Sequence, residues 1–333
     1  MTSPAPRPET IDRLDRAVYP SFAMLAGMQL DLFTPLKDGP LTVEQLAKAL
    51  SVRQDNLQPL LYALVAAGLL IVDGERFANT PEADHFLVRG KPSYMGGRHE
   101  GLLPRWNGVL KTAETIRTGV PQARLAIYGM SPDGAESYYR RSSPTTRRRA
   151  RDLVARYDFS SHHNLLDVGG GSGDLSIAFT EAYPQLKATV VDLPTVTPIT
   201  QRFVDEAKAG HRVQVVAADV VKGPLKGSYD VAVMLHLIQL LSPGQARRAI
   251  HNVGQVIQPG GWIYILGWVM DTSRVAPLEM VGLNLYYLNA YEHGQVYTEQ
   301  EHRDWLAEAG FVEGFERGVD GDWGSTMRAR KAA

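Results

Sequence analysis

The stretch that decides the fold is Leu-Leu-Asp-Val-Gly-Gly-Gly-Ser-Gly-Asp, residues 165–174 of a 333-residue chain. A short apolar run ends in an acid and a glycine cluster, and a helix-compatible segment follows from Leu175 to Glu181. Glycines lack Cβ, so the backbone can turn sharply and a nucleotide-like ligand can approach it closely. The pattern is typical of a buried parallel strand that leads into a helix through a ligand-binding turn.

A second acid, Asp192, ends the next apolar run, Ala188–Val191, about 20 residues after the glycines, where an acid typically hydrogen-bonds ribose hydroxyls. The dinucleotide fingerprint G-x-G-x-x-G fails, because Asp174 occupies the position of its third glycine. The shorter pattern G-x-G-x-G suits S-adenosylmethionine, which has no pyrophosphate. A purely structural glycine turn is the alternative.

From Asn164 onward the pattern alternates strands and helices, which predicts a parallel sheet with helices on both faces. The expected strands are Leu165–Val168, Ala188–Val191, Val213–Ala217, Val231–Leu235 and Trp262–Leu266. Two further segments, Phe311–Arg317 and Ser325–Arg330, are expected to form an antiparallel hairpin at the edge of this sheet.

Composition indicates a globular protein of two domains with a formal net charge of −1 and no cysteine. The lack of cysteine excludes disulfides, zinc-thiolate sites and cysteine nucleophiles, and we expect no metal. Residues 1–10 are polar and Pro-rich, which predicts a disordered tail and no signal peptide. No apolar run approaches the length of about 18–20 residues that a membrane span needs, so a cytoplasmic protein is expected.

Residues 11–95 are expected to form a winged-helix domain. Its first part, Ile11–Leu36, reads as mostly helical with a break near Pro20. Thr42 and Gln45 form a capping-box signature. The further expected elements are helices Val43–Leu50 and Asn56–Ala67 and strands Leu69–Val72 and Arg76–Asn79 around an Asp73-Gly74 turn.

A winged helix raises the possibility of DNA binding, which the charges oppose. Between Leu41 and Thr80 there are three basic residues against four acidic ones, and the second helix has no base. Phosphate contacts supply most of the affinity for DNA, so we expect no nucleic-acid partner and interpret this domain as a dimerisation surface. A helical connector, residues 96–158, is expected to join it to a cofactor-binding domain, residues 159–333.

The glycine motif, Asp192-Leu193-Pro194, Ala218-Asp219-Val220 and Pro259-Gly260-Gly261 together resemble class I S-adenosylmethionine-dependent methyltransferases. The chain is similar to the two-domain, homodimeric small-molecule O-methyltransferases that include plant caffeate enzymes and bacterial tailoring enzymes. The resemblance implies a Rossmann-like sheet and a winged-helix dimerisation domain that covers the partner's acceptor pocket. It assigns the ribose to Asp192 and the adenine amino group to Asp219. The implied cofactor contacts are Asp167, Gly169, Gly171, Gly173, Asp192, Leu193, Asp219, Val220 and Leu235.

The chain departs from this family where the catalytic residues should stand. The proton-accepting histidine position holds Gln239, and the positions of two flanking carboxylates hold Gly267 and Val296. A glutamine cannot accept a proton at physiological pH, whereas a positioned base is typically worth about 10²–10⁴-fold in rate. His236, three residues before Gln239, is expected to point elsewhere as a buried strand-end histidine.

A missing base favours an acceptor atom that carries no proton, such as a thioether sulfur. The segments Tyr19–Pro40 and Tyr291–Gln295 also resemble bacterial enzymes that S-methylate 4-methylthio-2-hydroxybutyrate in dimethylsulfoniopropionate synthesis. Arg147 in the basic run is one candidate cation for the substrate's carboxylate. The candidate substrate-binding residues are Tyr138, Tyr139, Arg147, His236, Tyr287 and Tyr291; the candidate catalytic or positioning residues are Gln239, His293 and Tyr291.

Other functions stay open at this point. One is O- or N-methylation of a hydroxylated aromatic metabolite with a relocated base, for which His293 and Glu292 are the best candidates. Another is C-methylation of a pigment precursor. The last is a protein that uses this scaffold without transferring a methyl group. Helix packing is an equally good explanation for Tyr138 and Tyr139.

Overall fold

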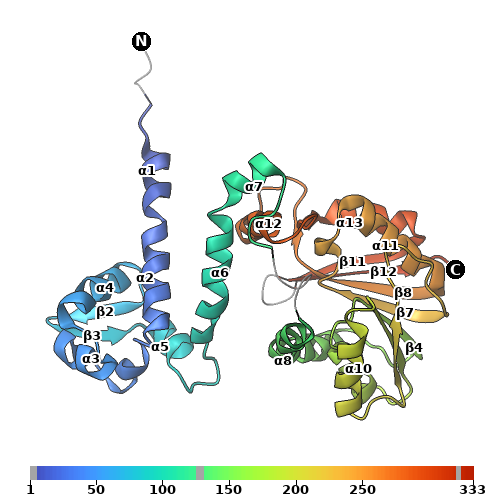
Figure 1. Ribbon diagram of the computed structural model, residues 1–333, viewed down its shortest axis with the longest axis horizontal. Helices are drawn as coiled ribbons and strands as arrows, with labels where there is room; N and C mark the ends of the chain where they lie inside the picture. The colour runs from blue at the N-terminus through green and yellow to red at the C-terminus, as the bar shows by residue number, and fades with distance from the viewer. Residues whose placement is uncertain (1–5, 125–130, 320–323) are drawn as a thin grey trace. The chain divides into compact units, whose positions relative to one another are not determined.

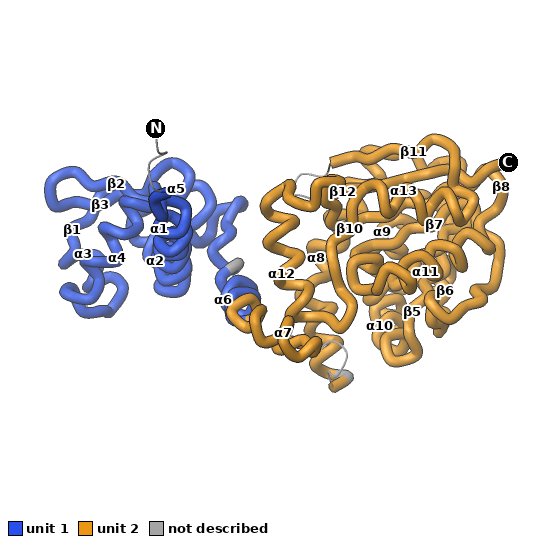
Figure 2. Tube along the Cα trace, turned by 90° about the horizontal axis from the view of Figure 1, so that it is seen from above, with its two compact units in different colours: residues 1–107 blue, residues 108–333 orange. Residues whose placement is uncertain are grey.

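The computed structural model describes residues 6–124, 131–319 and 324–333, and the chain divides into two compact units, residues 1–107 and 108–333 (Figure 2). Residues 1–5 of the expected tail lie outside the described ranges, and helix α1 (Glu9–Arg16) already includes residues 9 and 10. The unit boundary falls inside the expected connector. No helix in the described ranges is both long and apolar enough to cross a membrane.

The first unit begins with α1 and α2 (Val18–Gln29), separated at Ala17. Pro20 explains the break, because it has no N–H to donate to the carbonyl of residue 16. Several large apolar side chains remain exposed along these helices at spacings of three or four residues. They are Ile11, Leu14, Val18 and Phe22.

The winged-helix arrangement follows, with a three-stranded sheet in the order β1-β3-β2. Thr42 and Gln45 form the expected capping box at the start of α3. Gly74 turns the hairpin with φ +56°. The elements are η1 (Thr34–Asp38), β1 (Leu41–Thr42), α3 (Val43–Leu50), α4 (Gln54–Ala66), β2 (Leu70–Asp73), β3 (Arg76–Asn79), α5 (Pro81–Leu87) and η2 (Gly96–Arg98). Helix α6 (His99–Val109) ends this unit and begins the next.

The second unit is built on a seven-stranded sheet in the order β11-β12-β8-β7-β4-β5-β6 (Figure 1). The five strands from β8 to β6 are parallel, and β12 and β11 add an antiparallel edge. The strands are β4 (Asn164–Val168), β5 (Lys187–Asp192), β6 (Val213–Ala217), β7 (Tyr229–Leu235), β8 (Ile257–Gly267), β11 (Phe311–Val319) and β12 (Ser325–Lys331). All five expected parallel strands and the terminal hairpin are confirmed.

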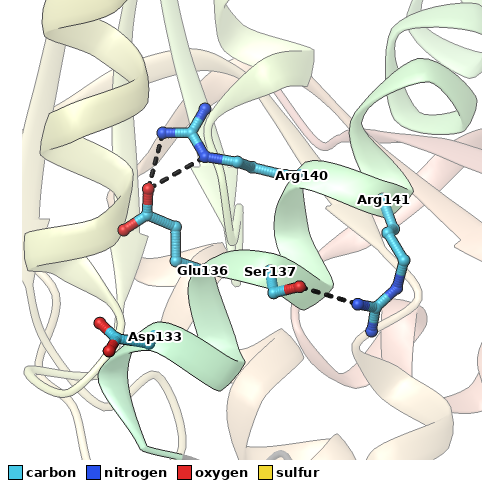
Figure 3. Close-up of a pocket in the computed structure, with 5 residues that line it drawn as sticks. All are labelled: Asp133, Glu136, Ser137, Arg140 and Arg141. Carbon is cyan, nitrogen blue, oxygen red and sulfur yellow. Dashed lines mark hydrogen bonds and ion pairs between the residues drawn. The ribbon is translucent and has the colours of Figure 1, made fainter.

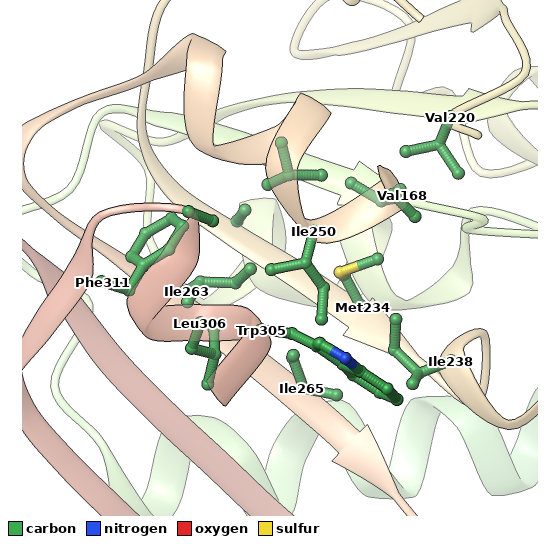
Figure 4. Packing of buried hydrophobic residues seen from close by; sticks show 14 of the residues in the cluster. Val168, Val220, Met234, Ile238, Ile250, Ile263, Ile265, Trp305, Leu306 and Phe311 are labelled. Carbon is green, nitrogen blue, oxygen red and sulfur yellow. The ribbon is translucent and has the colours of Figure 1, made fainter. Parts of the chain in front are cut away.

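Helices cover both faces of this sheet (Figure 1). One face packs a core around Ile250, Trp305 and Leu306 from α11 and α13 (Figure 4). The other packs Leu153, Phe179 and neighbours from α8, α9 and α10. The remaining elements are α7 (Thr112–Thr118), α8 (Pro132–Arg156), α9 (Asp174–Ala182), α10 (Thr197–Glu206), η4 (Ile238–Leu240), α11 (Pro243–Val256), β9 (Val269–Met270), α12 (Leu278–Ala290), β10 (Tyr297–Thr298) and α13 (Glu299–Glu308). Because the five central strands are parallel, their carboxyl ends meet at one edge of the sheet, which is where sheets of this kind bind ligands.

Candidate functional site

The glycine loop after β4 is a backbone cradle. Three glycines of this loop have positive φ: +67° at Gly169, +56° at Gly171 and +76° at Gly173. Residues with a Cβ rarely adopt this backbone conformation. The N–H of Gly169 donates to the carbonyl of Val191, 2.7 Å away, which ties the loop to β5. A Cβ on Gly171 would lie 2.6 Å from a ring carbon of Tyr139, so this tyrosine of α8 lies directly against the loop.

Two acids flank the cradle with different hydrogen bonding. Asp192 accepts from the N–H of Gly171 at 2.8 Å and from that of Leu193 at 2.7 Å, while burial raises its pKa. Asp167 is fully buried, and burial raises its pKa to about 7. Its Oδ2 accepts from Ser176 Oγ at 2.7 Å, and its Oδ1 has no hydrogen-bond partner among the described residues. Such an unsatisfied oxygen at the loop fits a ligand that donates hydrogen bonds.

The third acid expected at the cofactor, Asp219, follows β6. Its Oδ1 accepts from the N–H of Val221 at 2.9 Å, and its carboxylate lies 3.5 Å from Lys222. Val220 is buried in the core beside it, and Leu235 ends β7. The open glycine cradle and the three acids together suit S-adenosylmethionine, whose ribose, adenine and ammonium groups all need acceptors.

Helix α8 lies along this site and is held by ion pairs. Arg147 Nε lies 2.7 Å from Oδ1 of Asp174, a buried residue at the start of α9. The guanidinium expected to bind a substrate carboxylate is thus engaged within the protein. Figure 3 shows Arg140 and Glu136 lining a hollow on the same helix. Arg140 bridges Glu136 at 2.6 Å and Glu206 of α10 at 2.7 Å, and these pairs lower the pKa of both carboxyls.

Gln239 is buried beneath the carboxyl end of the sheet. Its Nε2 lies 2.8 Å from Nδ1 of His236, and its backbone carbonyl accepts from the N–H of Gln295 at 3.0 Å. A Cβ on Gly267 would lie 2.8 Å from Gln239 Oε1. The carboxamide therefore occupies space that exists only because position 267 is a glycine.

The expectation that His236 points away from Gln239 is wrong. His236 has φ +54°, and the 3₁₀ turn η4 begins two residues later. In such a turn side chains three residues apart lie on the same side, so His236 and Gln239 come together. Its ring centre lies 5.3 Å from that of Trp268, and the guanidinium of Arg149 lies 5.7 Å from the same indole ring. Burial, together with the positive charge of Arg149, lowers the pKa of His236 to about 3, so the imidazole is neutral at physiological pH.

Aromatic side chains of α12 complete the surroundings of Gln239. The hydroxyl of Tyr287 is in hydrogen-bonding reach of the Gln239 and Trp268 side chains, and burial raises its pKa. Tyr291 stacks on Tyr287 with ring centres 5.1 Å apart. Tyr138 of α8 interacts electrostatically with Tyr287 and meets Tyr139 edge to face at 5.4 Å. The structure thus brings these four tyrosines into the vicinity of the glycine loop and Gln239.

Other candidates lie differently. His293 is exposed, as is its neighbour Glu292, which pairs with Arg124 at 3.5 Å. Val296 is buried, and its N–H donates to Asn284 at 2.9 Å. Sequence reasoning did not single out Arg149. The signal was available, because positions 138 and 149 are eleven residues apart, three helical turns, and so share a face of α8.

Comparison with known proteins identifies the family. An O-methyltransferase domain matches residues 118–312, and an O-methyltransferase dimerisation domain matches residues 14–89. The chain belongs to the O-methyltransferase family. It is 30% identical over 316 residues to the tetracenomycin polyketide synthesis 8-O-methyl transferase TcmO of Streptomyces glaucescens, covering 92% of each chain. It is 28% identical to the 3-hydroxy-5-methyl-1-naphthoate 3-O-methyltransferase of Streptomyces sahachiroi, covering 92% and 90%.

The fold of this O-methyltransferase family member also matches solved structures. Human N-acetylserotonin methyltransferase in complex with S-adenosylmethionine superposes with a TM-score of 0.71 over the whole of both chains, at 22% identity. The expected class I fold, with its N-terminal dimerisation domain, is confirmed. The protein is an S-adenosylmethionine-dependent methyltransferase that acts on a small molecule.

Proposed function

We propose that the enzyme methylates an oxygen of a small, hydroxylated aromatic metabolite of the polyketide or naphthoate type. The observation that carries this proposal is the set of aromatic side chains around Gln239, formed by Tyr287, Tyr291, Trp268 and Tyr138, beside the glycine loop. Flat aromatic acceptors stack on such rings, and ligand pockets with these walls and a few polar groups are common. The two relatives that act on polyketide and naphthoate hydroxyls support the same substrate class.

S-adenosylmethionine supplies an electrophilic methyl group when bound. In the proposed reaction the loop glycines would admit it against the backbone. Asp192 and Asp219 would accept hydrogen bonds from its adenosine part, and Asp167 would be the candidate acceptor for its ammonium group. The aromatic rings hold the acceptor, so that its oxygen faces the methyl group in line. Proximity and alignment of this kind can supply about 7–11 kcal/mol of the barrier reduction.

S-methylation of 4-methylthio-2-hydroxybutyrate, which the sequence favoured, is not supported by the relatives. Both relatives described above are named as O-methyltransferases, and Arg147 is engaged by Asp174 at 2.7 Å. Transfer to nitrogen or carbon of an aromatic metabolite uses the same cofactor and the same aromatic walls. These acceptors are therefore the rivals in the experiment below.

We also propose that the enzyme is a homodimer joined through its first unit. The exposed apolar positions of α1 and α2 repeat every three or four residues, as expected of a helix face that packs against another chain. The dimerisation-domain match over residues 14–89 supports this proposal. Residues 11–95 then form the dimerisation domain, residues 96–158 the connector and residues 159–333 the cofactor-binding domain.

The test is an acceptor panel. The enzyme and S-adenosylmethionine are incubated separately with naphthols and hydroxynaphthoquinones, aromatic amines, and thioether acids, and S-adenosylhomocysteine and methylated product are measured by mass spectrometry. The proposal expects O-methylated product from the phenolic class. Product from thioether acids or amines alone would refute it, as would the absence of turnover with every phenol.

A further inference from the structure

His236 follows β7, and its imidazole ring is hydrogen-bonded at one nitrogen and unused at the other. Its Nδ1 atom lies 2.8 Å from Gln239 Nε2, and among the residues that the structure describes nothing is hydrogen-bonded to its own Nε2 atom. The residue lies deep in the site but keeps part of its surface accessible. The next side chain, Leu237, lies against the glycine loop, because a Cβ on Gly169 would be 3.1 Å from it. His236 therefore has one ring nitrogen left for a ligand beside that loop.

The surroundings of Gln239 set the direction of its hydrogen bond to this ring. The carboxamide nitrogen carries two hydrogens, and both Nδ1 of His236 and the hydroxyl oxygen of Tyr287 are within its reach. The same hydroxyl oxygen is in reach of the indole N–H of Trp268, a group that can only donate. The carboxamide oxygen, in contrast, lies over Gly267, 2.8 Å from where a Cβ would stand. Gln239 is therefore the donor in its contact with His236.

A donor at Nδ1 determines what the other side of the ring can do. Burial and, to a smaller extent, the charge of Arg149 lower the pKa of His236 to about 3, so the ring is neutral at physiological pH. A neutral imidazole carries one hydrogen, and if Nδ1 accepts from Gln239 that hydrogen is on Nε2. His236 therefore offers the site an N–H donor and no proton acceptor.

We propose that Gln239 is a positioning residue that holds His236 as its Nε2–H tautomer, and that this N–H binds a carbonyl oxygen carried by the aromatic acceptor. This inference rests on the proposed function and narrows its substrate class to hydroxylated aromatic rings that also bear a carbonyl group. Gly267 belongs to the same arrangement, because a side chain there would displace the carboxamide that orients the ring.

The partner of this N–H is a second oxygen of the acceptor rather than the oxygen that is methylated. A hydrogen bond to the reacting oxygen would draw on the lone pair that must attack the methyl group. A hydrogen bond to a carbonyl elsewhere on the ring leaves that lone pair free and fixes the orientation of the ring. Stacking on aromatic walls alone lets a flat ring slide and turn in its plane, so a directional contact adds the alignment that methyl transfer needs.

The first test reads the tautomer and needs no turnover. The full-length protein with ¹⁵N-labelled histidine rings is studied by NMR with S-adenosylhomocysteine bound, and the His236 signals are identified by their loss in His236→Asn. We expect a neutral ring with hydrogen on Nε2 from pH 6 to 8. In Gln239→Glu the new carboxylate can only accept, so the hydrogen should move to Nδ1 and the ring should bind a second proton at higher pH. Hydrogen on Nδ1 in the native protein, or the same tautomer in both proteins, overturns the proposal.

The second test compares two acceptors, a hydroxynaphthoate ester, which has a carbonyl, and the naphthol that lacks it. In His236→Phe, which keeps a flat ring without an N–H, kcat/KM should fall roughly threefold to tenfold more for the ester than for the naphthol, the factor that one neutral hydrogen bond supplies. His236→Gln retains an N–H donor and should preserve part of the preference. His251→Phe, at an exposed position on α11, should change neither value.

The comparison between native protein and variant cancels the different acidities of the two acceptors. An equal fall of kcat/KM for both acceptors in His236→Phe would mean that the ring has a structural role only, and it overturns the proposal. Lack of turnover with any phenol is a different result, because it refutes the proposed function, while the NMR measurement still decides whether Gln239 sets the tautomer of His236.

Discussion

Gly267→Ala is expected to disturb the reaction centre through a single methyl group. Gly267 ends β8, and its φ is outside the left-handed region, so alanine fits the backbone. The new Cβ would lie 2.8 Å from Gln239 Oε1, 3.5 Å from Cδ and 3.6 Å from Nε2. Real Cβ atoms do not approach oxygen so closely, so the buried carboxamide must move and give up its 2.8 Å contact with His236.

The size of the effect follows from that lost contact. A buried polar group left without its partner costs about 1–3 kcal/mol, and alanine returns about 0.4–1 kcal/mol by restricting the unfolded chain. We expect the free energy of unfolding to fall by roughly 1–2 kcal/mol, which lowers the melting temperature of a unit of this size by about 2–8 °C. Methyl transfer should fall as well, because Gln239 no longer holds His236.

Calorimetry of the purified protein measures this loss, and Gly282→Ala is the matched control. Gly282 is exposed in α12 with no atom within 4 Å of a new Cβ, so alanine there should stabilise by about 0.5–1 kcal/mol. In a Gln239→Ala background the carboxamide is gone and Gly267→Ala should cost nothing, which appears as a coupling energy of about 1 kcal/mol or more. Equal costs of Gly267→Ala in the two backgrounds would refute this account of the contact.

Three further predictions test the cofactor site, the first unit and the core. Gly171→Ala requires φ +56° of an alanine and places a Cβ 2.6 Å from Tyr139, so S-adenosylhomocysteine should no longer raise the melting temperature. Val18→Asp should convert the dimer to monomers, whereas Val312→Asp on the exposed edge strand should leave the dimer intact. The molar mass measured by light scattering distinguishes the two outcomes. Burial lowers the pKa of His302 to about 4, so as the pH falls the unfolded chain takes up a proton at this residue before the folded chain does. The free energy of unfolding should therefore fall by up to about 3 kcal/mol as the pH is lowered from 6.5 to 4. His302→Gln should flatten urea-unfolding stabilities over that range, and an unchanged slope would contradict this assignment.

Local sequence signals were sufficient for the fold. Thr42 and Gln45 predicted a helix start because a capping box depends only on residues three apart, and the glycines at 169–173 predicted the turn because backbone geometry excludes most alternatives. The direction of His236 was beyond such reasoning. Its left-handed backbone is rare outside glycine, and an ordinary strand-to-loop geometry would have sent its ring away from Gln239.

The remaining information lay in contacts between distant segments. When the sequence is compared with the family's motifs, positions 239, 267 and 296 appear as three separate losses of a catalytic side chain. In the structure, Gln239 Oε1 fills the space above Gly267, while the N–H of Gln295, next to Val296, donates to the Gln239 carbonyl. A side chain at 267 would expel the carboxamide from that space, so the glutamine and the glycine require one another. The departures at 239 and 267 therefore form one rearrangement, and the backbone next to position 296 is hydrogen-bonded to it. It replaces the proton acceptors that the resemblance implies with a hydrogen-bonded pair, Gln239 and His236, whose side chains lie 2.8 Å apart.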